Sequence, residues 1–156
     1  MNAAQFQQAS RKLFRFLEDD FGCRPVEPPP EATSLPPHLR GYFLRYENQT
    51  TGVSVHLEPP EQLPVVHIQE LGGSKEAHSL GMLLLAVAPH LNPLASERGL
   101  PLRQSARTLL QKYAEALKSV GPGLLRGDFE VFPRLRALRD LESQRRLAGQ
   151  PPLASY

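Results

Sequence analysis

Two amphipathic helical patterns fill the last third of the chain, and they constrain the fold more than any other feature. The first covers residues 102–120, and the second runs from about residue 128 to residue 148. In the first pattern, apolar side chains recur at steps of three and four residues, which lines one face of a helix; these are Ala106, Leu109, Leu110, Tyr113, Leu117 and Val120. A glycine–proline turn at residues 121–123 separates the patterns, and Asp128 is a candidate cap for the second helix. We therefore expect an antiparallel pair of helices at the C-terminus.

A further helix and a stiff connector are expected before the sheet. Residues 3–21 carry apolar side chains at helical spacing, and Gly22 is suited to end the helix. Residues 22–38 contain six prolines, which predicts an extended connector that cannot serve as a regular central strand. Residues 79–88 predict a short and mostly buried helix after the sheet.

Three segments alternate between apolar and polar residues, as half-buried strands do. They are residues 39–47, 52–58 and 63–70, with turns at 48–51 and 59–62. If the turns centre on Gln49/Thr50 and Glu61/Gln62, all the apolar side chains fall on one face of the sheet. The sequence thus predicts one α+β domain over residues 1–156, a three-stranded antiparallel meander with helices on one face. The expected shared core comprises Leu44, Val55, Leu57, Ile68, Leu110, Tyr113 and Leu117.

The opposite face of this sheet is the candidate functional surface. The same register places Phe43, His56 and His67 in a row across the three strands, with His56 directly opposite His67. Arg45 lies beside this row, and aromatic and arginine side chains dominate protein-binding hot spots. We predict that Phe43, Arg45, His56 and His67 bind a partner. The outer strands 39–47 and 63–70 would leave two sheet edges available to a protein partner or a homodimer.

The charge is small overall but uneven along the chain. The net charge is +2, yet residues 1–100 carry 8 Lys/Arg against 11 Asp/Glu, and residues 101–156 carry 10 against 5. This basic region leaves open a nucleic-acid accessory protein, but nucleic acid is the less favoured partner. Its aromatics occupy apolar helical positions, whereas nucleic-acid binding favours a dense basic stripe with rings free to stack.

The remaining composition favours a cytoplasmic protein that makes no membrane contact. The N-terminus lacks the layout of a signal peptide, and the longest apolar run, residues 81–88, is too short to span a bilayer. Cys23 is the single cysteine, so the chain has no intrachain disulfide framework.

No motif indicates an enzyme, a cofactor or a metal. His56 and His67 would need a third ligand, such as Glu47 or Glu58, to hold an ion. A small metal-dependent hydrolase is therefore an alternative to a binding protein. The glycines at residues 72–73 lack the spacing of a phosphate loop, and Cys23 has no histidine nearby in the sequence. We expect a non-enzymatic binding module with no cofactor and no bound metal.

The order of these elements resembles that of small bacterial α+β proteins of unassigned role, some of which are similar to immunity proteins of toxin systems. The resemblance rests on residues 14–21, 41–46, 53–57 and 106–132, including the sequence Leu-Leu-Arg-Gly-Asp-Phe at 124–129. It implies a protein-binding protein, for which an inhibitor or immunity-type protein of a bacterial toxin system is one form.

Overall fold

The computed structural model describes residues 1–27, 36–58, 63–94, 104–151 and 153. The expected turn at 59–62 and residues 28–35 of the expected connector lie outside these ranges. The elements follow in the order α1 (Ala3–Leu13), α2 (Phe16–Phe21), β1 (Arg24–Val26), α4 (Pro37–Arg40), β2 (Phe43–Glu47), β3 (Thr51–Glu58), β4 (Leu63–Glu70), β5 (Ala77–Ser79), α5 (Leu80–Val87), η1 (Pro89–Leu91), α6 (Ala106–Val120), α7 (Pro122–Leu125) and α8 (Phe132–Leu147).

The sheet is an antiparallel meander of five strands in the order β1-β2-β3-β4-β5. The α+β class is confirmed, but the sequence revealed only the three central strands. Residue 24 of β1 pairs with Glu47, and β5 pairs with β4 through His67 and Ser79. The expectation that the strands at 39–47 and 63–70 form the sheet edges is therefore wrong. Strand β1 covers β2 at residues 45–47 and β5 covers β4 at residues 67–69, so each of these strands is covered along part of its length. Strand β1 contains Pro25, a residue tolerated at a sheet edge.

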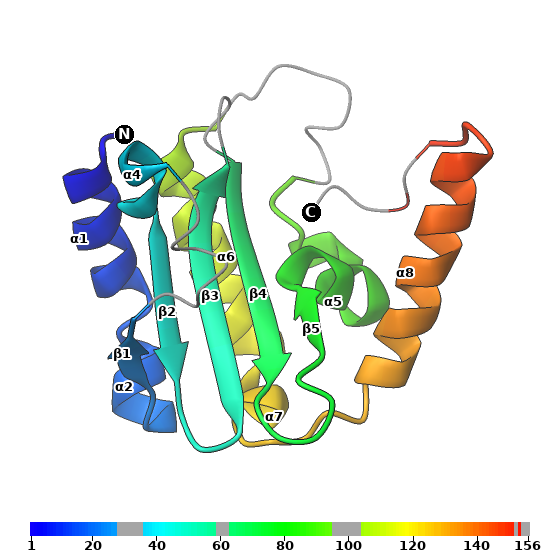
Figure 1. The fold of residues 1–156 in the computed structure, drawn as a ribbon, viewed down its shortest axis with the longest axis horizontal. Coiled ribbons are helices and arrows are strands. Elements are labelled where there is room, and N and C mark those ends of the chain that lie inside the picture. Colours follow the sequence, from blue (N-terminus) through cyan, green and yellow to red (C-terminus); the bar gives the residue numbers. More distant parts are fainter. Residues whose placement is uncertain (28–35, 59–62, 95–103, 152, 154–156) are drawn as a thin grey trace.

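The helices form a second layer on one face of the sheet. Helix α6 passes behind β3 and β4 in the view of Figure 1, while α1 lies beside β2 and α5 beside β4 and β5; α1 contacts β2, and both α5 and α6 contact β4. The seven residues expected in the core are all buried, and Leu110 and Leu117 are fully inaccessible. The one-sided helix layer expected from strand alternation is thus observed, and it leaves the other face of the sheet without a described helix across its centre.

The N-terminal helical pattern is divided into α1 and α2. The side-chain oxygen of Asn2 caps α1 by accepting a hydrogen bond from the backbone N–H of Gln5, and the side-chain oxygen of Gln5 accepts one from the backbone N–H of Asn2. The C-terminal capping residue of α1 is Phe14, and that of α2 is Gly22, which has a φ of 64°. A glycine adopts this left-handed conformation without steric cost, so the sequence located the end of the pattern correctly.

The two C-terminal helices do not form the expected antiparallel pair. Helix α8 packs against α5, which lies between α8 and α6 in Figure 1. Asp128 does not cap α8; its side chain accepts from the N–H of Glu130, and the helix begins at Phe132. Only Phe132 and Leu135 of α8 are buried, so the helix has a narrow apolar contact surface near its start.

The turn between β2 and β3 joins distant parts of the chain. The side-chain amide of Asn48 donates to the carbonyls of Phe21 in α2 and Leu125 in α7. Its oxygen accepts from the N–H groups of Thr50 and Thr51, and the Thr51 hydroxyl donates to the carbonyl of Leu124. The turn therefore satisfies carbonyl groups at the end of the short helix α7.

Among the described helices, none has the length and apolar character needed to cross a membrane.

Candidate functional site

Three flat rings lie in a row on the face of the sheet opposite the helices. The Phe43 and His56 rings are 5.6 Å apart between centroids and inclined by 15°, and the His56 and His67 rings are 5.7 Å apart and inclined by 9°. All three residues are half-buried. The row expected from the sequence is thus present. We use "polar face" for the surface made by Phe43, Arg45, Ser54, His56, His67 and Gln69.

The pairing that builds this row differs in one detail from the expectation. Phe43 pairs with His56 as expected, but His56 pairs with Val65, and His67 pairs with Ser54. The two histidines are therefore diagonal neighbours rather than directly opposite. Diagonal side chains are still within reach of one another for rings of this size, which explains why they stack.

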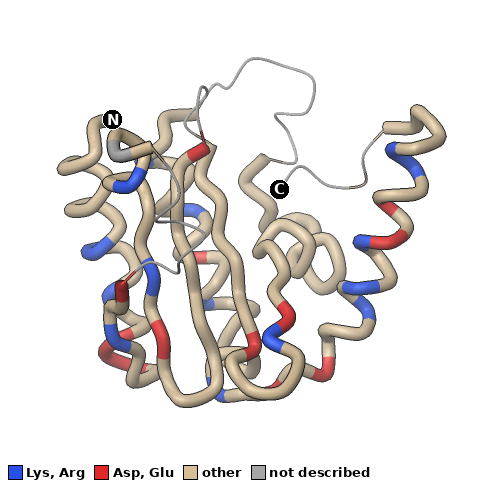
Figure 2. The backbone as a smooth tube through the Cα atoms, in the orientation of Figure 1, with Lys and Arg blue, Asp and Glu red and all other residues tan. Residues whose placement is uncertain are grey.

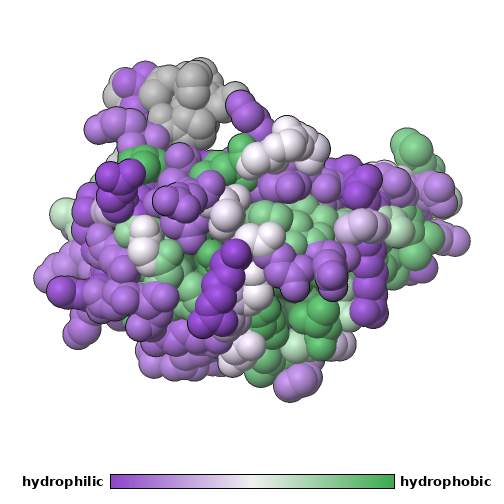
Figure 3. All heavy atoms as spheres, turned by 90° about the horizontal axis from the view of Figure 1, so that it is seen from below, coloured by the Kyte–Doolittle hydropathy of each residue, from purple (hydrophilic) through white to green (hydrophobic). Residues whose placement is uncertain are grey.

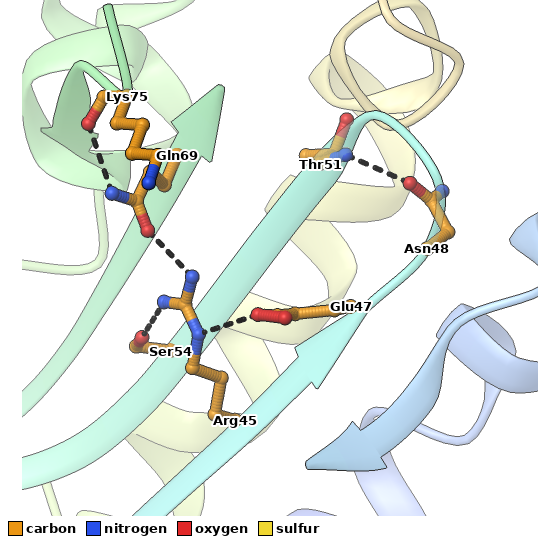
Figure 4. Close-up of polar contacts among 7 residues, drawn as sticks. All are labelled: Arg45, Glu47, Asn48, Thr51, Ser54, Gln69 and Lys75. Atoms are coloured by element: carbon orange, nitrogen blue, oxygen red, sulfur yellow. Dashed lines mark hydrogen bonds and ion pairs between the residues drawn. The ribbon is translucent and has the colours of Figure 1, made fainter. Parts of the chain in front are cut away.

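Arg45 is the most constrained side chain of the polar face. Its guanidinium donates to Ser54 Oγ at 2.8 Å and to the side-chain oxygen of Gln69, and its Nε lies 3.1 Å from a carboxylate oxygen of Glu47 (Figure 4). Gln69 in turn donates to the carbonyl of Lys75 at 2.9 Å. The Arg45 side chain is only 10% exposed. It therefore holds β2, β3 and β4 in register and leaves the rings as the more accessible part of the face.

Gly52 provides the space that Arg45 occupies. A Cβ added at Gly52 would lie 2.9 Å from Cζ of Arg45 and 3.3 Å from the Leu71 side chain. Glycine inside a strand often marks such a close approach. Gly52 was not predicted as a site residue, although a glycine within a strand pattern is the signal that could have indicated it.

Replacing Gly52 with alanine should displace the Arg45 guanidinium and lower the free energy of unfolding by about 1–3 kcal/mol, the usual cost of losing hydrogen bonds to a charged group. The measurement is chemical denaturation of wild type, Gly52→Ala, Arg45→Ala and the double variant.

In the Arg45→Ala background, the same Gly52 substitution should be neutral or stabilising, because the clash is gone and alanine reduces the entropy of the unfolded chain. Equal losses from Gly52→Ala with and without Arg45 would show that the two residues are not coupled.

Burial keeps the imidazoles of the polar face neutral. Burial lowers the pKa of His67 to about 4, with further lowering from nearby His56 and His78. Burial also lowers the pKa of His56, although Glu58, whose carboxylate lies 3.6 Å from Nε2, opposes the shift. At neutral pH the row therefore presents uncharged aromatic surface, and Nδ1 of His56 is buried without a hydrogen-bond partner among the described residues.

The structure brings Phe43, Arg45, His56 and His67 together as expected, but it adds no third metal ligand to the histidines. Within the described residues, no group of three His, Cys, Asp or Glu side chains is close enough to bind one ion. Cys23 is buried, and burial raises the pKa of its thiol to about 11, so it remains protonated at neutral pH.

A group of contacts around His78 was not anticipated from the sequence. Nε2 of buried His78 lies 3.1 Å from a carboxylate oxygen of Glu76, at an angle outside hydrogen-bond geometry, and Arg136 Nε lies 2.9 Å from the same oxygen. The His78 ring meets Phe132 edge-on at 4.8 Å. Because Arg136 and Phe132 belong to α8, this cluster attaches α8 to the edge strand β5. The three-residue strand gave no alternation from which to predict it.

Two hollows lie away from the polar face, and a third adjoins it. One, of about 450 Å³, is mostly apolar and lies among α5, α6 and α7; its lining includes Leu83, Val87 and Val120. Another of about 450 Å³ adjoins Asn48 and Arg126. The third hollow, of about 420 Å³, is partly lined by Phe43 and Arg45.

Seen from the end of the molecule where α7 lies, hydrophobic patches interrupt a largely hydrophilic surface (Figure 3).

Comparison of the chain with protein-family models, with curated proteins and with solved structures found no match.

Proposed function

We propose that this chain is a non-enzymatic protein-binding module and that the polar face contacts the partner. The observation that carries the proposal is the row of stacked, partly exposed rings at Phe43, His56 and His67. Aromatic side chains contribute disproportionately to the binding energy of protein interfaces.

The rigidity of the face supports this role. Arg45 bonds to neighbouring residues on all three central strands, so the rings stand on a fixed platform. A surface that is already ordered loses less conformational entropy on binding, which favours affinity. An inhibitor of the immunity-protein kind, which the sequence resemblance suggests, is the specific form of the proposal.

The partner can be sought by placing a photo-crosslinking phenylalanine analogue at Phe43 and expressing the protein in cells of its source organism. The analogue preserves the aromatic ring. The control carries it at Val87, which is 47% exposed and lies in the helical layer. We expect a defined partner to crosslink at Phe43 and not at Val87; the reverse pattern would refute the use of the polar face.

Binding to the purified partner should then weaken about tenfold or more on Phe43→Ala, which corresponds to at least about 1.4 kcal/mol. Isothermal titration calorimetry measures the dissociation constant. Val87→Ala is the matched control and should bind like wild type. Unchanged affinity of Phe43→Ala, in a variant shown to be folded, would contradict the proposal.

A further inference from the structure

The hollow among α5, α6 and α7 has an apolar wall that reaches solvent. Its volume is about 450 Å³, and its apolar lining includes Leu83, Val87, Val120 and Val131. Leu83 is buried, whereas Val87 is 47% exposed. The hollow therefore offers apolar surface that another apolar side chain can cover, with a free-energy gain roughly proportional to the area removed from water.

Both charged residues that line this hollow are acidic. Asp128 and Glu130 are exposed, and neither takes part in an ion pair within the described part of the chain. Arg126, which is close to Asp128 in the sequence, instead lies over the Phe21 ring, 5.3 Å from its centroid. The two carboxylates give the lining a formal charge of −2, so the hollow suits a ligand that combines apolar surface with positive charge.

One side of helix α8 presents this complementary combination. Arg134, Leu138, Leu141 and Arg145 recur at steps of four, three and four residues, so they lie along one side of the helix. We call these four residues the α8 stripe. Leu141 is 45% exposed and lies between the two arginines. Nε of Arg145 donates to the backbone carbonyl of Pro151, a neutral group that leaves the charge of the guanidinium uncompensated.

Helix α8 is basic as a whole, and its stripe is available to another molecule. It contains five arginines against two carboxylates, which gives a net charge of +3, and Figure 2 shows its basic positions at one side of the molecule. Among the ion pairs of the described residues, only that of Arg136 with Glu76 involves α8. The described lining of the hollow includes no residue of α8, and the helix runs from the level of α7 toward the opposite end of the molecule (Figure 1).

We propose that the α8 stripe of one copy docks in the hollow of a second copy of this chain. Leu141 enters the apolar hollow, and the flanking arginines lie against Asp128 and Glu130. The contact joins two different surfaces, so each copy can offer its stripe to one neighbour and its hollow to another. A contact made by one side of a single helix is small, and small interfaces associate weakly. The inference goes beyond the proposed function, because neither surface contains a residue of the polar face.

Sedimentation equilibrium of the full chain tests the inference over concentrations of about 1 μM to 1 mM, a range that covers weak association. We expect the average mass to rise with concentration above that of one chain. The rise should be smaller at high salt, which screens exposed charges.

Two double variants remove the two sides of the contact separately. Asp128→Asn/Glu130→Gln alters the hollow, and Leu141→Gln/Arg145→Gln alters the stripe; each should associate at least about tenfold more weakly than wild type. Asparagine keeps a side-chain oxygen at residue 128, where Asp128 accepts from the N–H of Glu130, so the local turn should persist.

Mixing the two variants is the decisive measurement. The hollow variant retains an intact stripe, and the stripe variant retains an intact hollow, so an equimolar mixture should associate more strongly than either variant alone. The control Asp19→Asn/Asp20→Asn removes two exposed carboxylates from α2 and changes the net charge as the hollow variant does. It should associate like wild type.

Three results would overturn the inference: a chain that stays monomeric over the whole range, variants that associate like wild type, or a mixture that associates no more strongly than its components. The photo-crosslinking analogue at Val87 should capture only a second copy of this chain, identified by mass spectrometry. A monomeric chain that captures a partner at Phe43 refutes only the contact between copies. Self-association through the hollow without any partner at Phe43 refutes only the proposed function.

Discussion

Replacing Leu110 with alanine should lower the free energy of unfolding by about 2–5 kcal/mol, the range for truncating a buried leucine. Leu110 lies in α6 and is fully inaccessible to solvent, within the core formed by the helical layer and the sheet. The substitution removes apolar contacts and leaves a cavity that the surrounding close-packed side chains fill only in part. The measurement is urea denaturation followed by circular dichroism.

The matched control is the neighbouring residue of the same helix. Gln111 is exposed, so Gln111→Ala should change stability by less than about 0.5 kcal/mol. A Leu110→Ala midpoint close to that of Gln111→Ala would mean that this position is not a core position.

Acidification from pH 6.5 to pH 4 should destabilise the native protein through His67, by up to about 3 kcal/mol. The folded-state pKa of His67 is about 4, against an ordinary value of 6.5. In this window the unfolded chain binds a proton at His67 that the native protein excludes, so protons favour unfolding. The contribution is absent above pH 6.5 and complete below pH 4. The lowered pKa values of His56 and His78 act in the same direction.

Because carboxylates also titrate in this range, the informative quantity is the difference between wild type and His67→Gln. Glutamine does not titrate, so the variant should lose less stability on acidification than wild type. His90→Gln serves as the control, since it removes an exposed imidazole from η1. Parallel stability–pH curves for wild type and His67→Gln would show that His67 is freely protonated in the folded protein.

The face assignment of the central strands could be predicted because side-chain alternation has a period of two residues. The expected register between β3 and β4 paired Val55 with Ile68, whereas the structure pairs Val55 with Val66. A slip of two residues returns every side chain to the same face, so the core and the polar face were both identified correctly. The slip changed the direct partner of each residue across β3 and β4, including His56 and His67, but not the face on which the side chain lies.

The parts of the fold that the sequence did not reveal are those whose position depends on contacts distant in the chain. Strands β1 and β5 have three residues each, too few for alternation to be recognised. Helix α8 has a helical pattern, but nothing in that pattern specifies α5 as its neighbour. The hollow of about 420 Å³ beside Phe43 is lined by residues of α1, α4, β1 and β2, which only the folded chain brings together.

The turn at Asn48 has a mechanical consequence for the C-terminal part of the protein. Because the turn fixes the end of α7, the starting point of α8 is determined by the sheet. The far half of α8 has few anchors: Leu141 is 45% exposed and Leu147 is 91% exposed. Helix α8 is thus held near its start, and its C-terminal half makes few contacts with the rest of the protein. Because Phe132 and Arg136 also hold the start of α8 against β5, a displacement of either attachment would be largest at the exposed C-terminal end of the helix.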